Sequence, residues 1–238
     1  MRAADPVADP ARGVELRDVG HSYGDRVVLR DVDLRLTERR VGVIGANGSG
    51  KSTFARLLNG LVQPTSGQVL VDGLDTRADV RAVRRRVGFV FADPDAQIVH
   101  PTVAEDVAYG LENQGVPADE RTERVAEVLA RHGLAGHADH PAHLLSGGQK
   151  QLLAIAGVLV MRPARIVFDE PTTLLDLVNA RRVGELIAGL AQQVVVVTHQ
   201  LDLLDGFDRV LVVDRGRVVT DAAPGPAVAA YRRLMADR

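Results

Sequence analysis

The stretch GANGSGKS at residues 45–52 follows an apolar run at residues 41–44 and precedes the helix-forming sequence TFARLLNGL. It completes the pattern G-x-x-x-x-G-K-S, in which glycines let successive backbone N–H groups turn toward the phosphates of a nucleotide. The helix that follows would present its positive dipole end to the same anion. A strand, a glycine-rich loop and a helix in this order predict a phosphate-binding loop rather than an ordinary turn.

Lysine usage supports this prediction, because the 29 lysines and arginines of the chain include only two lysines, Lys51 and Lys150. The ammonium of a lysine is a compact point charge that the planar guanidinium of an arginine does not reproduce. We expect Lys51 to reach the β- and γ-phosphates of ATP and Ser52 to offer its hydroxyl to Mg²⁺. The loop residues expected to bind ATP are Gly45, Asn47, Gly48, Ser49, Gly50, Lys51, Ser52 and Thr53.

The composition is that of a globular chain, with 238 residues, 46% of them hydrophobic, and a formal net charge of −2. The absence of cysteine excludes disulfides, thiolate metal sites and cysteine nucleophiles. Apolar stretches fall short of the roughly 18–20 residues that span a bilayer, and the N-terminus lacks a secretory signal, so a cytosolic location is expected. The near-neutral charge argues against nucleic acid as a partner, and the basic run at residues 81–86 is interpreted as a solvated helix face.

The order of the predicted elements indicates an α/β fold. Residues 1–12 are expected to form a flexible tail, and residues 13–238 a single domain. Short β-type runs within residues 14–41 predict an N-terminal antiparallel β-subdomain. From about residue 96 to 150, an apolar period of 3.6 residues predicts an α-helical subdomain inserted into the core.

Strand and helix alternation resumes after this insertion. The β-branched apolar runs at residues 165–169 and 194–198 are typical of strands covered on both faces, which favours a mostly parallel sheet. A hairpin with its turn at residues 214–216 and a terminal helix complete the chain. The other predicted elements are helices over residues 52–60, 147–160 and 176–191 and strands over residues 64–73 and 87–91.

Two carboxylates stand at the end of the strand predicted over residues 165–169. In a mostly parallel sheet, Asp169 and Glu170 would lie at the strand-end crevice in which ligands bind. Asp169 can hold the metal, and Glu170 can polarise the water that attacks the γ-phosphate. The alternative is a strand that simply ends in acidic turn residues, and the phosphate-binding loop upstream makes it the weaker interpretation.

A second anion-binding helix start is predicted at residues 145–149, LSGGQ. The N–H groups of this turn and the Ser146 hydroxyl would open a helix toward an anion. One nucleotide does not need two such helix starts from one chain. The arrangement therefore predicts that two copies pack head to tail, each closing the ATP site of the other.

Taken in this order, the motifs resemble those of the ATP-binding subunits of ABC transporters over residues 14–222. The resemblance implies a P-loop NTPase core that hydrolyses ATP as a homodimer. Residues 45–52 match the Walker A loop, and Asp169 and Glu170 match the end of the Walker B strand with its catalytic glutamate. The residues that match the family signature, and would therefore contact ATP, are Ser146, Gly147, Gly148 and Gln149.

Three further residues take their roles from this resemblance. Asp176 corresponds to the D-loop aspartate, His199 to the switch histidine that contacts the γ-phosphate, and Tyr23 to the aromatic that stacks on adenine. Taken alone, they could equally be a helix N-cap, a turn histidine and a strand-packing aromatic. In the family pattern, His199 joins Lys51 and Glu170 as a catalytic residue.

The segment FADPDAQIVHPTVAEDVAYG at residues 91–110 resembles the energy-coupling-factor ATPases of vitamin and transition-metal importers. In that group the segment receives coupling helices of a transmembrane T component, which works with a substrate-binding S component in the membrane. FADPDAQIV at residues 91–99, together with DEPTTLLD at residues 169–176, looks most like the ATPases of biotin importers. The resemblance implies a peripheral protein at the cytoplasmic face of the cell membrane. The alternatives are the ATPase of another ABC importer and a soluble ABC ATPase that acts on nucleic acid.

One position departs from the family pattern. In the family, the strand that matches residues 87–91 ends with a glutamine that contacts Mg²⁺ and the attacking water, whereas this chain has Ala92 there. Gln97 is not interpreted as its replacement, because resembling sequences have a glutamine at that place as well. Water can complete the shell of Mg²⁺, so we expect ATP binding to survive and the rate or the coupling to transport to change.

Overall fold

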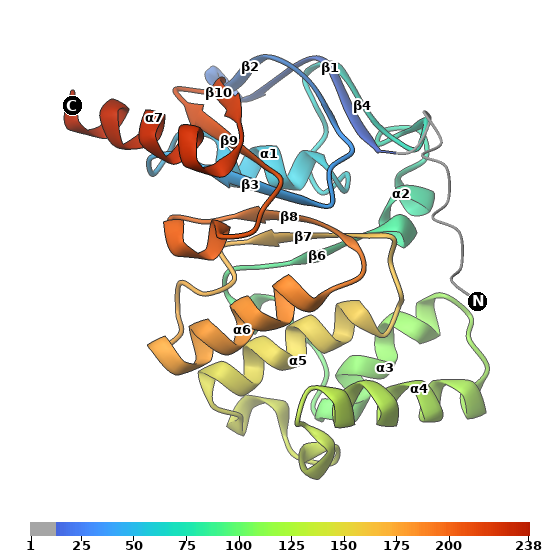
Figure 1. Cartoon of the computed structure of the whole chain (residues 1–238). Helices are drawn as coiled ribbons and strands as arrows, with labels where there is room; N and C mark the ends of the chain where they lie inside the picture. The colour runs from blue at the N-terminus through green and yellow to red at the C-terminus, as the bar shows by residue number, and fades with distance from the viewer. Residues whose placement is uncertain (1–12) are drawn as a thin grey trace, which may run out of the picture. The chain divides into compact units, whose positions relative to one another are not determined.

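The computed structural model describes residues 13–238, so the tail predicted over residues 1–12 lies outside the described part of the chain. The chain divides into two compact units. The first combines residues 13–84 with Phe207–Arg238, and the second is Arg85–Gly206. The predicted helical insertion falls within the second unit. The helices and strands of both units are drawn in Figure 1.

The first unit contains an antiparallel sheet with the strand order β2-β1-β4-β5. Antiparallel pairing of β1 with β2 brings Tyr23 opposite Arg26 at the end of a hairpin. This sheet confirms the predicted N-terminal antiparallel subdomain. Its strands are β1 (Val14–Tyr23), β2 (Arg26–Leu36), β4 (Ser66–Val71) and β5 (Leu74–Asp75).

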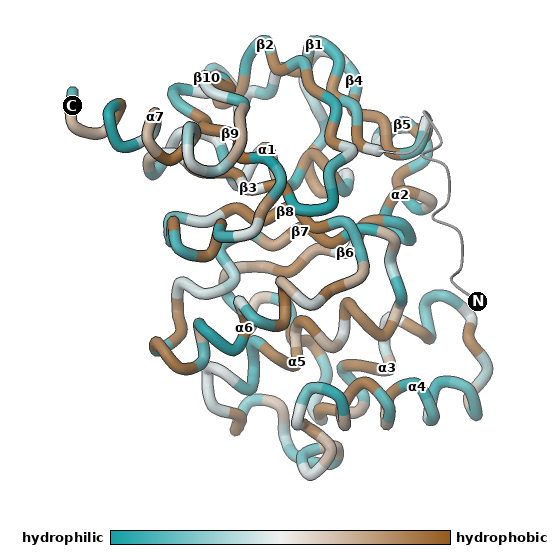
Figure 2. The backbone as a smooth tube through the Cα atoms, viewed as in Figure 1, coloured by the Kyte–Doolittle hydropathy of each residue, from teal (hydrophilic) through white to brown (hydrophobic). Residues whose placement is uncertain are grey.

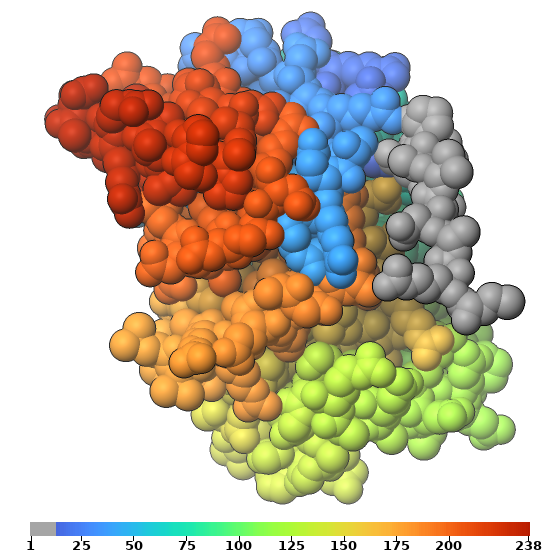
Figure 3. Space-filling model, viewed as in Figure 1, coloured from blue at the N-terminus to red at the C-terminus, as the bar shows by residue number. Residues whose placement is uncertain are grey.

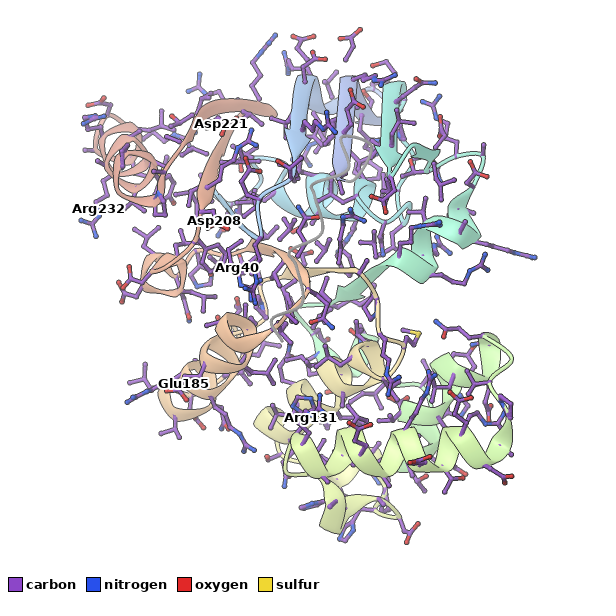
Figure 4. The ribbon with its side chains drawn as sticks, turned by 45° about the vertical axis from the view of Figure 1, so that its right-hand side comes forward. Arg40, Arg131, Glu185, Asp208, Asp221 and Arg232 are labelled. Carbon is purple, nitrogen blue, oxygen red and sulfur yellow. The ribbon has the colours of Figure 1, made fainter. Side chains whose placement is uncertain are left out.

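A second set of strands in the first unit carries the predicted phosphate loop. β3 (Arg40–Ile44) runs parallel to β9 (Arg209–Asp214), and β9 pairs antiparallel with β10 (Arg217–Ala222). All five residues of β3 are buried, as expected of a strand covered on both faces. At its start, the backbone N–H of Arg40 donates to the Asp208 carboxylate at 2.7 Å, and Figure 4 shows these two residues side by side.

Two helices of the first unit frame these strands. α1 (Lys51–Leu57) follows the loop, and α7 (Pro224–Ala236) packs on the β9–β10 hairpin at the surface (Figure 3). α1 is shorter than the helix predicted over residues 52–60. Residues 58–60 instead form a turn that ends with Gly60 in the left-handed region, at φ +69°. A further helix, α2, spans Val80–Arg86.

The second unit contains three parallel strands in the order β8-β7-β6. Val87 lies opposite Arg165, and Arg165 lies opposite Gln193, so the carboxyl ends of the strands share one edge. Every residue of β6 and β7 is buried, which confirms the mostly parallel sheet that the apolar runs predicted. The strands are β6 (Val87–Val90), β7 (Arg165–Asp169) and β8 (Gln193–Val197).

Helices make up the rest of the second unit. α3 packs against α4 and α5, and the alternating brown and teal of α4 in Figure 2 reflects a single apolar face. The α-helices are α3 (Val103–Asn113), α4 (Ala118–Arg131), α5 (Gly147–Leu159) and α6 (Leu177–Gly189). Short 3₁₀ helices are η1 (Pro94–Ala96), η2 (Ala135–His137), η3 (Ala142–Leu144) and η4 (Leu201–Leu204).

Candidate functional site

The predicted phosphate loop leaves the buried strand β3 and enters α1 through two closely packed glycines with positive φ, Gly45 and Gly50. Gly50 is the N-cap of α1, at φ +110°. A Cβ at this position would lie 2.8 Å from the Leu29 side chain and 2.9 Å from the Val28 carbonyl oxygen. A Cβ at Gly45 would lie 2.1 Å from the Val213 carbonyl oxygen. The loop therefore follows its path because neighbouring backbone packs directly on it.

Lys51 is the first residue of α1 and is only 6% exposed. Its ammonium donates to the carbonyl oxygens of Gly45 at 2.9 Å and Ala46 at 3.1 Å, so the side chain folds back along the loop. These oxygens compensate a buried positive charge, and phosphate oxygens could do so equally well. Ser52 is half-buried and Thr53 is buried.

The β9–β10 turn packs against the phosphate loop. The N–H of Gly216 donates to the Ser49 carbonyl oxygen at 3.0 Å. A cavity of about 370 Å³ opens beside this contact, lined by residues 46–49 together with Arg215 and Arg238. Sequence reasoning missed these two arginines, because Arg215 occupied an ordinary hairpin turn and Arg238 the chain end. Arg238 is paired with the Asp214 carboxylate, so Arg215 is the side chain of the two that adds positive charge at the loop, which favours an anionic ligand.

Tyr23 stands at the end of β1 with 51% of its surface exposed. Its ring meets the ring of His21 edge-on, with a centroid separation of 4.5 Å. An aromatic ring that is held at one edge and exposed elsewhere is suited to stacking on a flat ligand such as adenine. The contact with His21 also agrees with the alternative interpretation, a strand-packing aromatic, while the exposed part of the ring is free to stack.

In the second unit, β7 ends with the two predicted carboxylates. Asp169 is 3% exposed and is the last residue of the buried strand. Glu170 follows with φ +55°, a left-handed conformation that is unfavourable for a residue with a side chain. Its N–H still donates to the Val197 carbonyl oxygen at 2.9 Å. Backbone strain of this kind is typical of functional sites.

The Glu170 carboxylate is held by two residues of its own unit. Its Oε2 atom lies 2.7 Å from Nδ1 of His199, accepts the His199 N–H at 3.3 Å, and accepts the Thr173 hydroxyl at 3.1 Å. Sequence reasoning assigned His199 to the γ-phosphate and did not predict its contact with Glu170. The register of β7 and β8 explains the contact, because both residues follow the carboxyl ends of neighbouring parallel strands.

The start of α5 contains the predicted signature residues. The Ser146 hydroxyl accepts the Gln149 N–H at 3.3 Å, and the Gln149 side-chain oxygen accepts the Ser146 N–H at 2.9 Å. This reciprocal pair is a capping box. Gly147 is exposed, whereas Gly148 is buried against α6, where an added Cβ would lie 2.4 Å from the Asn179 side chain.

Asp176 is the N-cap of α6, as its alternative interpretation stated. Its carboxylate accepts the backbone N–H and the side-chain amide of Asn179, each at 2.8 Å. These bonds, the backbone one first, lower the pKa of the Asp176 carboxyl. Asn179 thus connects Asp176 with Gly148. Sequence reasoning missed Asn179, although the D-x-x-N spacing of a helix cap was visible.

The side chain of Gln97, in the loop after β6, forms hydrogen bonds with two backbone groups of the second unit. The Gln97 side chain accepts the Phe91 N–H at 3.1 Å and donates to the Ala154 carbonyl oxygen at 2.8 Å. Both ends of its amide are therefore engaged in joining the end of β6 to α5. Asp93 accepts the Asp95 N–H at 3.0 Å and caps η1. These contacts agree with the prediction that Gln97 does not replace the glutamine missing at Ala92.

The fold and the phosphate loop define a nucleotide-binding P-loop protein. A family model described as ABC transporter matches residues 29–173, so the chain belongs to the ABC transporter family, as an ATP-binding subunit that hydrolyses ATP. Tyr23, Asp176 and His199 lie outside the matched residues.

Two relatives match over nearly their full length. An ABC transporter ATP-binding protein of Deinococcus radiodurans is 60% identical over 222 residues, which are 93% of this chain and 98% of the relative. The biotin transport ATP-binding protein BioM of Rhizobium etli is 47% identical over 223 residues, which are 94% of this chain and 99% of the relative. The comparisons therefore confirm the resemblance that the motifs indicated.

Two solved structures share the fold. One is CbiO1 from Clostridium perfringens, part of the ABC transporter complex CbiONQ, with a TM-score of 0.80 and 33% identity over 94% of this chain and 93% of that chain. The other is a dimeric ATP-binding cassette in a post-hydrolysis state with ADP and phosphate, with a TM-score of 0.78 and 30% identity over 89% of this chain and 98% of that chain. Among the described residues, no helix has the length and apolar character of a membrane span.

Proposed function

We propose that this chain is the ATP-hydrolysing subunit of an energy-coupling-factor type importer at the cytoplasmic face of a membrane. The observation that carries the ATPase part of the proposal is the presence, in one chain, of a phosphate loop ahead of α1 and a capped, glycine-containing helix start at α5. The relative named for biotin transport supports biotin as the solute. The solved relative from a transporter complex supports membrane partners, which we propose are a T component and an S component.

In the proposed site, the N–H groups of the loop and the Lys51 ammonium hold the β- and γ-phosphates of ATP. Binding would exchange the carbonyl contacts of Lys51 for phosphate oxygens, so the buried charge stays compensated throughout. The exposed ring of Tyr23 stacks on adenine. Arg215, which lines the cavity beside the loop, adds to the attraction for the phosphate chain, whereas Arg238 is paired with Asp214.

Mg²⁺ is proposed to bind together with the nucleotide. Within residues 13–238, no group of three or more His, Asp or Glu side chains could hold a metal ion on its own. This fits Mg²⁺, which keeps several waters and commonly uses one or two protein oxygens plus substrate phosphates. The protein ligands we propose are the Ser52 hydroxyl and the Asp169 carboxylate. Bound Mg²⁺ would neutralise charge that develops on the phosphates.

Glu170 is proposed to orient and polarise the attacking water. Contacts from His199 and Thr173 fix its Oε2 atom, which limits the positions that the carboxylate can adopt. The bond from the Glu170 N–H to the Val197 carbonyl oxygen also holds the backbone from which the carboxylate extends. His199, which follows the neighbouring strand β8, is proposed to contact the γ-phosphate.

Two copies are proposed to bind head to tail. Ser146, Gly147, Gly148 and Gln149 of one copy would contact the ATP held on the phosphate loop of the other, with Asp176 nearby. The solved dimeric relative supports this arrangement. Mixed dimers test it. Lys51→Ala chains combined with Ser146→Arg chains should regain activity through one intact site, whereas each variant alone should be inactive. A purified heterodimer without activity would contradict the shared site.

The membrane partners are tested separately. A tagged chain purified from solubilised membranes should bring two hydrophobic proteins with it, and ATP hydrolysis by the recovered complex should drive uptake of radiolabelled biotin into vesicles. Recovery of the tagged chain with nucleic acid, and without hydrophobic partners, would instead favour the soluble ATPase alternative.

A further inference from the structure

A histidine from outside the known motifs contacts the signature sequence. His137 ends the 3₁₀ helix η2, and its Nε2 atom lies 3.1 Å from the side-chain nitrogen of Gln149. Neither the motif comparison nor the family match assigns a role to this histidine. The two residues are 12 positions apart and are brought together by the connection between α4 and α5.

The hydrogen bonds determine which atoms donate and which accept. Because the Gln149 oxygen accepts the Ser146 N–H, its NH₂ group must face His137. An amide NH₂ is a donor, so Nε2 of His137 must accept, and the ring proton must sit on Nδ1. That Nδ1 is buried and has no hydrogen-bond partner within the described residues. Within the described residues, the contact with Gln149 is therefore the one side-chain hydrogen bond that the His137 ring forms.

The ring occupies a fixed position. The His137 N–H donates to the Leu134 carbonyl oxygen at 2.9 Å, and the His137 carbonyl oxygen accepts the His140 N–H at 2.9 Å. Leu134 is fully buried, so it anchors this turn in the helical part of the unit. The rings of His137 and His140 also contact each other, with centroids 5.1 Å apart.

We propose that His137 is a positioning residue for ATP-dependent dimerisation, because it holds the Gln149 amide in the orientation that caps the signature turn. Without this acceptor, the amide can rotate, the Ser146 N–H loses its partner, and the turn that meets the ATP of the other copy is less well ordered. The inference rests on the proposed head-to-tail dimer. It adds a residue that touches neither ATP nor the reacting atoms.

The test uses the Glu170→Gln chain, which should bind ATP without hydrolysing it and accumulate as a dimer. In this background, His137→Leu should weaken ATP-dependent dimerisation by about three- to tenfold, the effect of one lost hydrogen bond. His137→Gln should stay within about twofold of the parent, since a glutamine oxygen can replace Nε2 as the acceptor. His143→Leu, at an exposed histidine on the same connection, is the matched control and should behave like the parent.

Sedimentation of each variant with ATP measures dimerisation, and binding of a fluorescent ATP analogue to the isolated monomer measures nucleotide affinity. The affinity should be the same in all four chains, which a general folding defect would not allow. In a chain that keeps Glu170, His137→Leu should lower kcat for ATP hydrolysis and leave the KM for ATP within about twofold of the wild-type value. His137→Leu and Gln149→Leu combined should have no larger effect than Gln149→Leu alone.

Two results would overturn the role of His137: dimerisation of His137→Leu at the level of the parent, or effects of the two leucine substitutions that simply add. A Glu170→Gln parent that stays monomeric with ATP would instead refute the proposed dimer itself. The two failures are therefore distinguishable in one experiment.

Discussion

The phosphate loop of the first unit and the signature turn of the second are both glycine-containing turns that open a helix, yet they are stabilised differently. The phosphate loop is determined by close backbone contacts, since Cβ atoms at Gly45 and Gly50 would collide with neighbouring strands. The signature turn is partly exposed and depends on side-chain hydrogen bonds between Ser146 and Gln149 and on packing against Asn179.

This difference matches what each turn is proposed to do. A loop whose glycines pack against neighbouring backbone and whose lysine is enclosed is preorganised for one ligand, and substitutions at Gly45 or Gly50 would distort it. A surface turn held by individual hydrogen bonds, worth about 0.5–1.5 kcal/mol each, can adjust when a second molecule arrives. Two sites for the same phosphates can therefore differ widely in how well they tolerate substitutions.

The largest effect is expected at Glu170. Glu170→Gln keeps the shape of the side chain but removes the charge that polarises water, so ATP hydrolysis should fall by at least about 10²- to 10³-fold. ATP binding should persist, because the phosphate loop is untouched. Steady-state hydrolysis and equilibrium ATP binding measure the two quantities. A variant that hydrolyses ATP at the wild-type rate would show that the water is activated by another group.

The next largest effect is expected in the phosphate loop. Lys51→Ala removes a charged hydrogen-bond donor worth about 1.5–3 kcal/mol, so ATP affinity should fall by about ten- to hundredfold. Lys150→Ala is the matched control, because it removes the only other lysine, which pairs with Asp95 at 2.7 Å, and it should leave affinity unchanged. Calorimetric titration with ATP compares the two, and equal affinities would contradict the predicted role of the loop.

A smaller effect is expected where the signature turn packs on α6. Gly148→Ala places a Cβ against Asn179 and should lower the free energy of unfolding by about 1–3 kcal/mol, the usual cost of overpacking. Gly147→Ala should cost less, because its Cβ would meet nothing within 4 Å. Denaturant unfolding measures both. Adding Asn179→Ala to Gly148→Ala should recover part of the loss, and no recovery would place the strain elsewhere.

The smallest effect is expected at Ala92. Ala92→Gln supplies a hydrogen bond for the attacking water, and at about 0.5–1.5 kcal/mol it should raise the basal ATPase rate about two- to tenfold with little change in ATP affinity. Gln97 should not interfere, since both ends of its amide are bonded to backbone. The ATPase rates of the wild type and of Ala92→Gln are compared at saturating Mg-ATP. An unchanged rate would mean that another group already orients the water.

The class of protein, the phosphate loop and the order of strands and helices could all be predicted from the amino-acid sequence. These features follow from local patterns: glycines ahead of Lys51, β-branched runs such as residues 165–169, and a 3.6-residue apolar period in α4. Each requires only neighbouring residues, so each is visible without a structure. The exact helix ends were less predictable, because turns such as residues 58–60 depend on what packs beside them.

The contacts between distant side chains became visible in the folded chain alone. Glu170 meets His199 across 29 positions, Asn179 meets Gly148 across two helices, and His137 meets Gln149 from the α4–α5 connection. Such contacts arise from strand register and helix packing, which bring together residues that share no local pattern. A motif can therefore predict the atoms that act on the phosphates, whereas the residues that hold those atoms in place depend on how distant segments pack.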